Sequence, residues 1–188
     1  MLTFYGEWLS LWQERTKNMG FWTKLSDSLQ SSIFAAVKEG GLEKVKTLLA
    51  GNPDLVFKKD NAGWTPLHYA AHWHQKDVAE LLLANKAEVD AQATGGLKPL
   101  HCAVAQGFKD VAELLLANKA DVNAQDNEGV TPLHFAVDEG RKDLVELLLC
   151  SNADLNAKDY HGKTPLRWAV SKGNADVAEL LRLRGGSE

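Results

Sequence analysis

A proline–leucine pair returns every 33 residues along this chain of 188 residues, at Pro66-Leu67, Pro99-Leu100, Pro132-Leu133 and Pro165-Leu166. A Glu-Leu-Leu-Leu run recurs at the same spacing, starting at Glu80, Glu113 and Glu146. A fixed period of this length is the signature of a solenoid, in which similar short units stack in a row. Because no such unit can bury its apolar face alone, the core must form between neighbouring units.

The residues inside each unit predict a turn followed by two short helices. The pattern Asp-x-x-Gly favours a tight turn, Thr is a good helix N-cap, and Pro is tolerated in the first helical turn. Apolar residues at helical spacing, such as Val111, Leu114 and Leu115, indicate the second helix. Glycines that can adopt a left-handed conformation are expected to end the first helix in three units: Gly107, Gly140 and Gly173.

These units resemble the ankyrin repeat family over residues 60–71, 95–107, 126–140 and 159–173, which carry versions of Thr-Pro-Leu-His. A degenerate first unit aligns from Ala36 to Leu49 if one residue is inserted near Asn52-Pro53. The resemblance implies an all-α ankyrin solenoid with β-turn fingers, and hydrogen bonds between repeats from His68, His101 and His134. We expect the repeats to span residues 29–59, 60–92, 93–125, 126–158 and 159–188, with the first and last as caps.

Several residues depart from the family pattern. His74 stands where a glycine usually ends the first helix, and Lys98 replaces the capping threonine. Lys86 and Lys119 occupy the usual glycine position after the second helix. If the left-handed backbone angle is kept there, each lysine costs about 1 kcal/mol.

Residues 1–28 lie before the repeats and are rich in tryptophan. One face of an N-terminal helix would carry apolar anchors at helical spacing: Phe4, Trp8, Leu11 and Trp12. This helical extension is expected either to fold back as a cap on the end of the array or to dock into the groove of another protein. A self-association surface or an added sequence is a further alternative.

Composition excludes several classes of function. The net charge of −4 argues against a nucleic-acid binder, which needs a basic surface. No apolar run is long enough for a membrane span, and we find no signal peptide at the N-terminus. Two cysteines form no disulfide framework and favour a reducing compartment, so we expect a cytoplasmic protein.

The sequence also lacks the motifs of catalysis. It contains no phosphate-binding loop, no dinucleotide turn and no paired-histidine metalloprotease motif. His68 and His72 have the spacing of two metal ligands on a helix, but His68 belongs to the repeat motif. We therefore expect neither an enzyme nor a bound metal or cofactor.

The family resemblance implies a protein partner bound by the concave groove of fingers and first helices. Positions there that differ between repeats are the predicted contacts: Trp64, Tyr69, His72, Trp73, Leu97, Gln106, Val130, Phe135, Asp138, Glu139, Tyr160, Lys163 and Trp168. Trp64, placed at a finger tip, and Trp73 are the expected anchors. Tyr69, Phe135 and Trp168 either bind the partner or pack between repeats. Asp138 and Glu139 suggest a partner with some basic character.

The sequence therefore predicts a monomeric, non-catalytic protein-interaction module. Two alternatives remain open. The chain is a regulatory or inhibitory subunit of an enzyme, or it is a carrier scaffold whose N-terminal aromatic helix docks into a partner.

Overall fold

The computed structural model describes residues 33–187, and within that range the regular structure is helical, without strands. The first repeat contains a helix at 33–38, α2 (Leu42–Gly51) and the 3₁₀ helix η1 (Pro53–Phe57). The next repeats contain α3 (Pro66–His72) with α4 (Lys76–Ala84), and α5 (Pro99–Gln106) with α6 (Lys109–Ala117). The last repeats contain α7 (Pro132–Asp138) with α8 (Lys142–Cys150), and α9 (Pro165–Lys172) with α10 (Ala175–Leu183).

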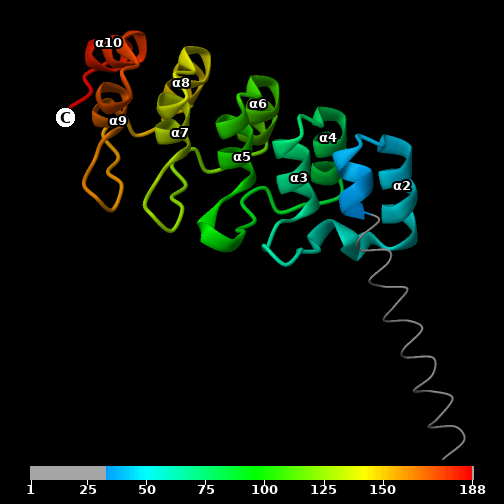
Figure 1. Ribbon diagram of the computed structural model, residues 1–188. Coiled ribbons are helices and arrows are strands. Elements are labelled where there is room, and N and C mark those ends of the chain that lie inside the picture. The colour runs from blue at the N-terminus through cyan, green and yellow to red at the C-terminus, as the bar shows by residue number, and fades with distance from the viewer. Residues whose placement is uncertain (1–32, 188) are drawn as a thin grey trace, which may run out of the picture.

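The helix pairs stack in one row and form two layers (Figure 1). The first helices of the repeats pack on one another along the inner layer, from α3 through α5 and α7 to α9. The second helices form the outer layer, from α2 to α10. Loops between successive pairs project beyond the inner layer as fingers (Figure 1). This arrangement confirms the predicted ankyrin-type α-solenoid.

The core runs along the whole array between the two layers. It is built from residues that recur in register and are almost fully buried: Leu67, Leu100, Leu133 and Leu166 from the inner helices, and Leu82, Leu115, Leu148 and Leu181 from the outer helices. Alanines at 70, 103, 136 and 169 have no exposed surface, which lets the inner helices approach closely. Each repeat thus completes the core of its neighbours, as expected for a solenoid.

The repeat histidines join neighbouring units. His68 accepts a hydrogen bond at Nδ1 from the backbone N–H of Thr65 (3.1 Å), and its Nε2 lies 3.1 Å from the carbonyl oxygen of Leu97 in the next repeat. His134 reaches the carbonyl of Lys163 in the next repeat in the same way, at 3.2 Å, whereas His101 lies 3.1 Å from the carbonyl of Ala124, near the end of its own repeat. The inter-repeat hydrogen bond that the resemblance implies is therefore present for His68 and His134.

The residues that replace the family's glycines keep the left-handed backbone conformation of those positions. Lys86 and Lys119 adopt left-handed φ angles of 67° and 69°, and His74 has a φ of 56°. The His74 ring stacks on Phe108 at 4.3 Å between centroids, and its Nε2 lies 2.8 Å from Asp110 Oδ1. An intrinsically unfavourable backbone angle is thus accompanied by a contact that joins two repeats.

Lys98 has a different role from the threonine that it replaces. Its backbone N–H still donates to Nδ1 of His101 (3.1 Å), so the helix keeps part of its cap. Its ammonium lies 3.7 Å from both Asp90 and Asp121, and its side chain is largely buried. The lysine therefore bridges two carboxylates that come from successive repeats.

Candidate binding surface

The inner face, formed by the fingers and the inner helices, is shaped by an aspartate at the base of three fingers: Asp60, Asp126 and Asp159. In the second repeat, Asp60 Oδ1 accepts hydrogen bonds from the backbone N–H groups of Ala62 and Trp64, both at 2.8 Å. Its second oxygen accepts the hydroxyl of Tyr69 at 2.7 Å. A single carboxylate therefore closes the turn and ties the finger to α3.

The last repeat repeats this arrangement, with Asp159 Oδ2 accepting a hydrogen bond from the indole N–H of Trp168 at 2.9 Å. The third repeat has Ala93 in place of the aspartate, and the 3₁₀ turn η2 (Thr94–Gly96) forms its finger. Gly96 has a φ of 83°, and a Cβ there would lie 2.6 Å from the backbone nitrogen of Asn127. The third finger is thus built on close backbone approach instead of a carboxylate.

Backbone hydrogen bonds connect each of these fingers to the next. Thr94 N–H donates to the carbonyl of Ala62, Asn127 N–H to that of Gly95, and Tyr160 N–H to that of Glu128, each at 2.9 Å. The fingers therefore form one continuous ladder, and the inner face is largely preformed. A preformed surface loses less conformational entropy when it binds a partner.

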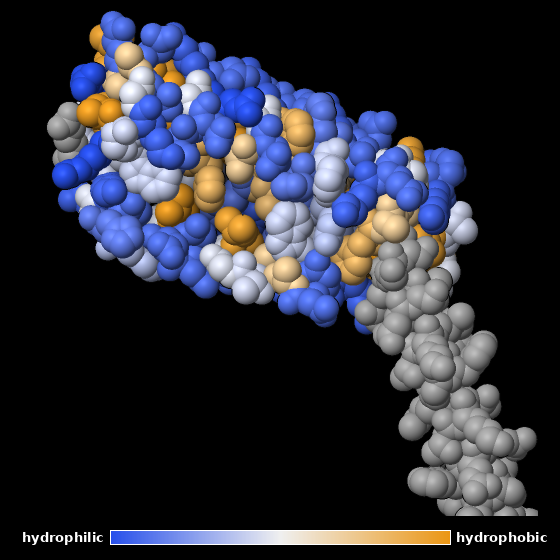
Figure 2. Space-filling model, in the orientation of Figure 1, coloured by the Kyte–Doolittle hydropathy of each residue, from blue (hydrophilic) through white to orange (hydrophobic). Residues whose placement is uncertain are grey.

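Aromatic rings gather at the N-terminal end of this face. The aromatic patch consists of Phe34, Trp64, Tyr69, His72 and Trp73. Its successive ring centroids lie 5.2 to 5.4 Å apart, which is the range of attractive edge and tilted contacts. Figure 2 shows pale and apolar side chains in a band over the inner helices and the finger bases, with hydrophilic side chains around it.

Exposure differs sharply within the aromatic patch. Trp73 is 46% exposed at the end of α3, whereas Trp64 is half-buried against His68, Tyr69 and His72. The prediction that Trp64 lies at a finger tip was wrong. Asn61 and Ala62 form the tip, and Trp64 lies after the turn, where the chain runs back toward α3 and packs against the core. Trp73 therefore offers the larger free surface.

A lysine borders the aromatic patch. Lys38 Nζ lies 5.1 Å from the centroid of the Trp73 ring and 6.0 Å from that of Tyr69, within the range of cation–π attraction. Sequence reasoning missed Lys38 and Phe34 because the first repeat lacks the Thr-Pro-Leu-His signature. The alignment of the first repeat with the fourth, which places Lys38 opposite Asp138, contained the signal that could have found it.

Burial also changes the protonation of the patch. Burial and the acceptor Asp60 raise the pKa of Tyr69 to about 12, so its hydroxyl remains a donor. Burial, and to a lesser extent Lys38, lowers the pKa of His72 below its usual value. The His72 ring is therefore neutral at neutral pH, and Lys38 is the cation beside the rings.

The aromatic residues at the equivalent inner-helix position pack between repeats. Phe34 contacts Tyr69, His101 contacts Phe135, and His134 contacts Trp168, with centroids 5.2, 5.7 and 5.3 Å apart. In each pair, a ring on one inner helix contacts the ring 34 residues later, or 35 residues later for Phe34 and Tyr69. The extra residue in the first pair agrees with the single insertion in the alignment of the first repeat. The shared pattern supports packing for Tyr69, Phe135 and Trp168, whose half-buried outer edges still face the surface.

The other predicted contact residues differ in their exposure to solvent. Exposed side chains are found at Gln106, Glu139, Tyr160 and Lys163, with Tyr160 71% exposed. Val130 lies at the finger base and is only 8% exposed. It therefore offers little surface to a partner, and we do not include it among the proposed contacts. Leu97 is half-buried. The anchors predicted on the N-terminal extension (Phe4, Trp8, Leu11 and Trp12) lie outside the described residues.

The acidic pair expected on the fourth repeat is only partly available. Asp138 Oδ1 lies 2.8 Å from the ammonium of Lys172 in the next repeat. The hydrogen bond and the charge of Asp138 raise the pKa of Lys172, so the ammonium stays charged. The remaining exposed carboxylate is that of Glu139, which weakens the expectation of a partner with basic character.

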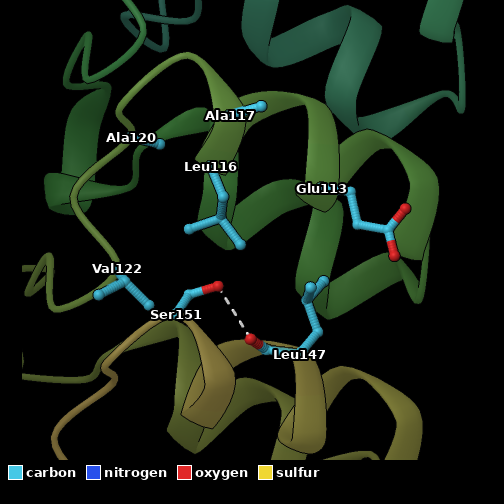
Figure 3. A pocket seen from close by; sticks show the side chains of 7 residues that line it. All are labelled: Glu113, Leu116, Ala117, Ala120, Val122, Leu147 and Ser151. Atoms are coloured by element: carbon cyan, nitrogen blue, oxygen red, sulfur yellow. Dashed lines mark hydrogen bonds between the residues drawn. The ribbon is translucent and has the colours of Figure 1, made fainter.

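A hollow lies on the outer layer, between α6 and α8 (Figure 3). It is lined by five apolar residues, one acidic residue and one serine: Leu116, Ala117, Ala120, Val122, Leu147, Glu113 and Ser151. The Ser151 hydroxyl donates to the carbonyl of Leu147 at 2.9 Å (Figure 3). Of these lining residues only Glu113 is ionisable, so the hollow has no pair of groups for acid–base chemistry.

Metal sites, reactive thiols and membrane spans each require particular side chains or a long apolar helix. Residues 33–187 contain no group of three or more histidine, cysteine, aspartate or glutamate side chains that could hold a metal ion. Cys102 is buried, which raises the pKa of its thiol to about 12 and disfavours the reactive thiolate. None of the helices in this range is long and apolar enough to cross a bilayer.

Comparison with known proteins matches residues 23–93 and 100–187 to the family described as ankyrin repeats (3 copies). The chain is 43% identical over 56 residues to ankyrin repeat domain-containing protein 49 of Drosophila melanogaster, and 36% identical over 56 residues to the human 2-5A-dependent ribonuclease. It is 39% identical over 61 residues to human protein phosphatase 1 regulatory subunit 27.

Each of these matches involves about a third of this chain. The matched segment spans 26%, 8% and 39% of the three relatives, in the same order. The similarity is therefore one of repeats and does not extend over whole proteins.

Proposed function

The chain belongs to the ankyrin repeat family, a family of protein-interaction modules that is typically non-catalytic, and we propose that it binds a partner protein through its inner face. The observation that supports this proposal is the aromatic patch, where Trp73 remains 46% exposed on a rigid helix end. Tryptophan and tyrosine are the residues most enriched among interface hot spots. A monomeric, cytoplasmic protein without catalytic activity, metal or cofactor is part of the same proposal.

The ladder of fingers supports a mechanism of rigid presentation. The backbone hydrogen bonds between fingers hold the exposed residues of four repeats in one fixed order. Trp73 is the proposed anchor, and Trp64 is assigned a supporting role because three neighbouring rings contact it. Gln106, Glu139, Tyr160 and Lys163 would supply contacts further along the face.

A pull-down with the full chain, followed by calorimetry with the captured protein, tests this function. Trp73→Ala should weaken binding at least fivefold, about 1 kcal/mol, while the melting temperature changes little. Leu183→Ala is the matched control, because it removes a side chain that is 79% exposed at the end of α10. Unchanged affinity of the Trp73 variant would contradict the proposal.

The N-terminal extension is the alternative binding element. Deletion of residues 1–28 separates the two, provided that a melting curve shows the shortened chain to be folded. Retention of the partner by the folded truncation would place recognition on the repeats. Loss of the partner would assign it to the aromatic helix.

A regulatory role is the second candidate function. It is favoured by the identity of 39% with a protein named as a regulatory subunit of protein phosphatase 1. If this role applies, the captured partner is an enzyme whose turnover changes when the full chain is added in excess. A partner without enzymatic activity, or an enzyme with unchanged turnover, would reject it.

A further inference from the structure

Lys38 stands beside the aromatic patch without an acidic neighbour of its own. Within residues 33–187 no carboxylate lies within ion-pair distance of its ammonium. The adjacent Glu39 is directed to Lys44, at 4.0 Å. Asp60, which holds Tyr69 of the patch, already accepts two backbone N–H groups and the Tyr69 hydroxyl.

Two other lysines, Lys98 and Lys172, are neutralised by contacts between repeats. Lys172 pairs with Asp138 at 2.8 Å, and Lys98 lies 3.7 Å from each of two aspartates. His68 and His72 also face the rings, and burial lowers the pKa of each, so both are neutral at neutral pH. Among residues 33–187, Lys38 therefore places a positive charge without an ion-pair partner above apolar ring surface.

A charge in this position discriminates between partners. A lysine or arginine side chain approaching Trp73 would meet the like charge of Lys38, which already occupies the ring faces. A carboxylate would gain an ion pair at the edge of a low-dielectric surface, where Coulomb interactions are stronger than in water. Charge complementarity across an interface contributes mainly to specificity and to the association rate.

We propose that the aromatic patch recognises a protein segment in which an acidic side chain stands beside a large apolar one. The carboxylate pairs with Lys38 Nζ while the apolar side chain lies on the exposed ring of Trp73. This inference rests on the proposed function, since it names the chemistry that the inner face selects.

Selection from a phage-displayed library of random 12-residue peptides tests the specificity. The full chain, Lys38→Glu and the control Lys109→Glu are each immobilised as bait. Lys109 is exposed at the start of α6, outside the aromatic patch, and its variant makes the same change of charge without disturbing the pair of Lys44 and Glu39. We expect the full chain and the control to select peptides in which aspartate or glutamate stands next to leucine, phenylalanine or tryptophan. The Lys38→Glu bait should instead select peptides with lysine or arginine next to the apolar residue.

The selected peptide is then titrated against each protein. Its affinity should fall about tenfold or more on Lys38→Glu, with the loss reduced at high salt, and should be unchanged on Lys109→Glu. Apolar peptides without acidic bias, bound equally by the full chain and Lys38→Glu, would overturn the acidic preference. If Trp73→Ala nevertheless abolished binding of these apolar peptides, the proposed function would still hold. If Trp73→Ala left their binding intact, the proposed function would be contradicted as well.

The remaining outcomes also decide the question. Failure to select any common peptide would overturn the inference. Dimerisation of the full chain that is lost in both Lys38→Glu and Trp73→Ala would show that a second copy occupies the patch, and would overturn it as well. Light scattering of the three proteins without peptide measures this directly.

Discussion

Two lysines hold backbone conformations that glycine adopts without strain. Lys86 and Lys119 have φ angles of 67° and 69° directly after α4 and α6, and both side chains are exposed. The left-handed conformation costs a non-glycine residue about 1 kcal/mol. Lys86→Gly and Lys119→Gly should therefore each raise the free energy of unfolding by up to about 1 kcal/mol, measured by urea denaturation.

The two changes should add, because the sites are separated by a whole repeat. Lys44→Gly, within the regular helix α2, is the control and should lower stability by about 1 kcal/mol. A loss of stability at positions 86 and 119 as large as that of the control would refute the assignment of strain.

Three buried histidines predict that the protein is less stable in mild acid. Burial lowers the pKa of His68 to about 4, and also lowers the pKa values of His101 and His134. An unfolded histidine takes up its proton near pH 6.5, whereas folded His68 does so only near pH 4. Between these values the unfolded state binds more protons, so stability falls as the pH falls.

The expected slope is at most about 1.4 kcal/mol per pH unit for each such histidine. Urea denaturation at pH 7.5, 6 and 5 measures it. His68→Gln should reduce the slope, because it removes the most strongly shifted of these groups. Stability that is constant from pH 7.5 to 5 would contradict the prediction.

At the scale of the element, the fingers differ in how they are attached to the inner helices. Tyr69 and Trp168 donate to the aspartates nine residues before them, but the equivalent Phe135 carries no donor for Asp126. Phe135→Tyr should therefore add a hydrogen bond to a charged acceptor and stabilise the protein by about 1 kcal/mol. Tyr69→Phe should destabilise it by a similar amount.

Urea denaturation of a double-mutant cycle checks the cause. The gain from Phe135→Tyr should disappear in the background Asp126→Asn, because the charged acceptor is then absent. A gain of equal size in both backgrounds would show that the hydroxyl acts without Asp126.

The same scale shows how far the sequence predicts this structure. The inner and outer helices, the glycine positions and the strained lysines follow from residue types at a fixed spacing. The turn η2 and the 3₁₀ helix η1 occur where a repeat departs from its motif, so no pattern specified them. The packing of Trp64 was also missed, because register places a residue along the chain but does not determine the direction of its side chain.

For the whole molecule, the period predicts a row of units, and the structure shows that successive inner helices pack on one another from α3 to α9. The candidate site could be predicted only in outline. Register identified the inner face and Trp73, but the patch depends on Lys38 and Phe34 from the degenerate first repeat. Contacts between a regular and an irregular repeat are not encoded in the period.

Nearest-neighbour packing makes the effect of a substitution depend on its place in the row. Ala103 on α5 and Ala169 on α9 occupy the same register and have no exposed surface. Ala103 lies in a repeat with a neighbour on each side, whereas the last repeat leaves Val170 47% exposed on its outer side. Glycine at either position removes the same buried methyl group and costs the helix about 1 kcal/mol.

The consequences of the two substitutions should nevertheless differ. Ala103→Gly weakens interfaces on both sides, so it should lower the global free energy of unfolding and speed hydrogen exchange across the array. Ala169→Gly should speed exchange chiefly in α9 and α10, because a terminal unit can open while the remaining repeats stay stacked. Hydrogen exchange of both variants, followed by mass spectrometry, separates these cases. Equal acceleration along the whole chain for both would mean that the repeats unfold as a single cooperative unit.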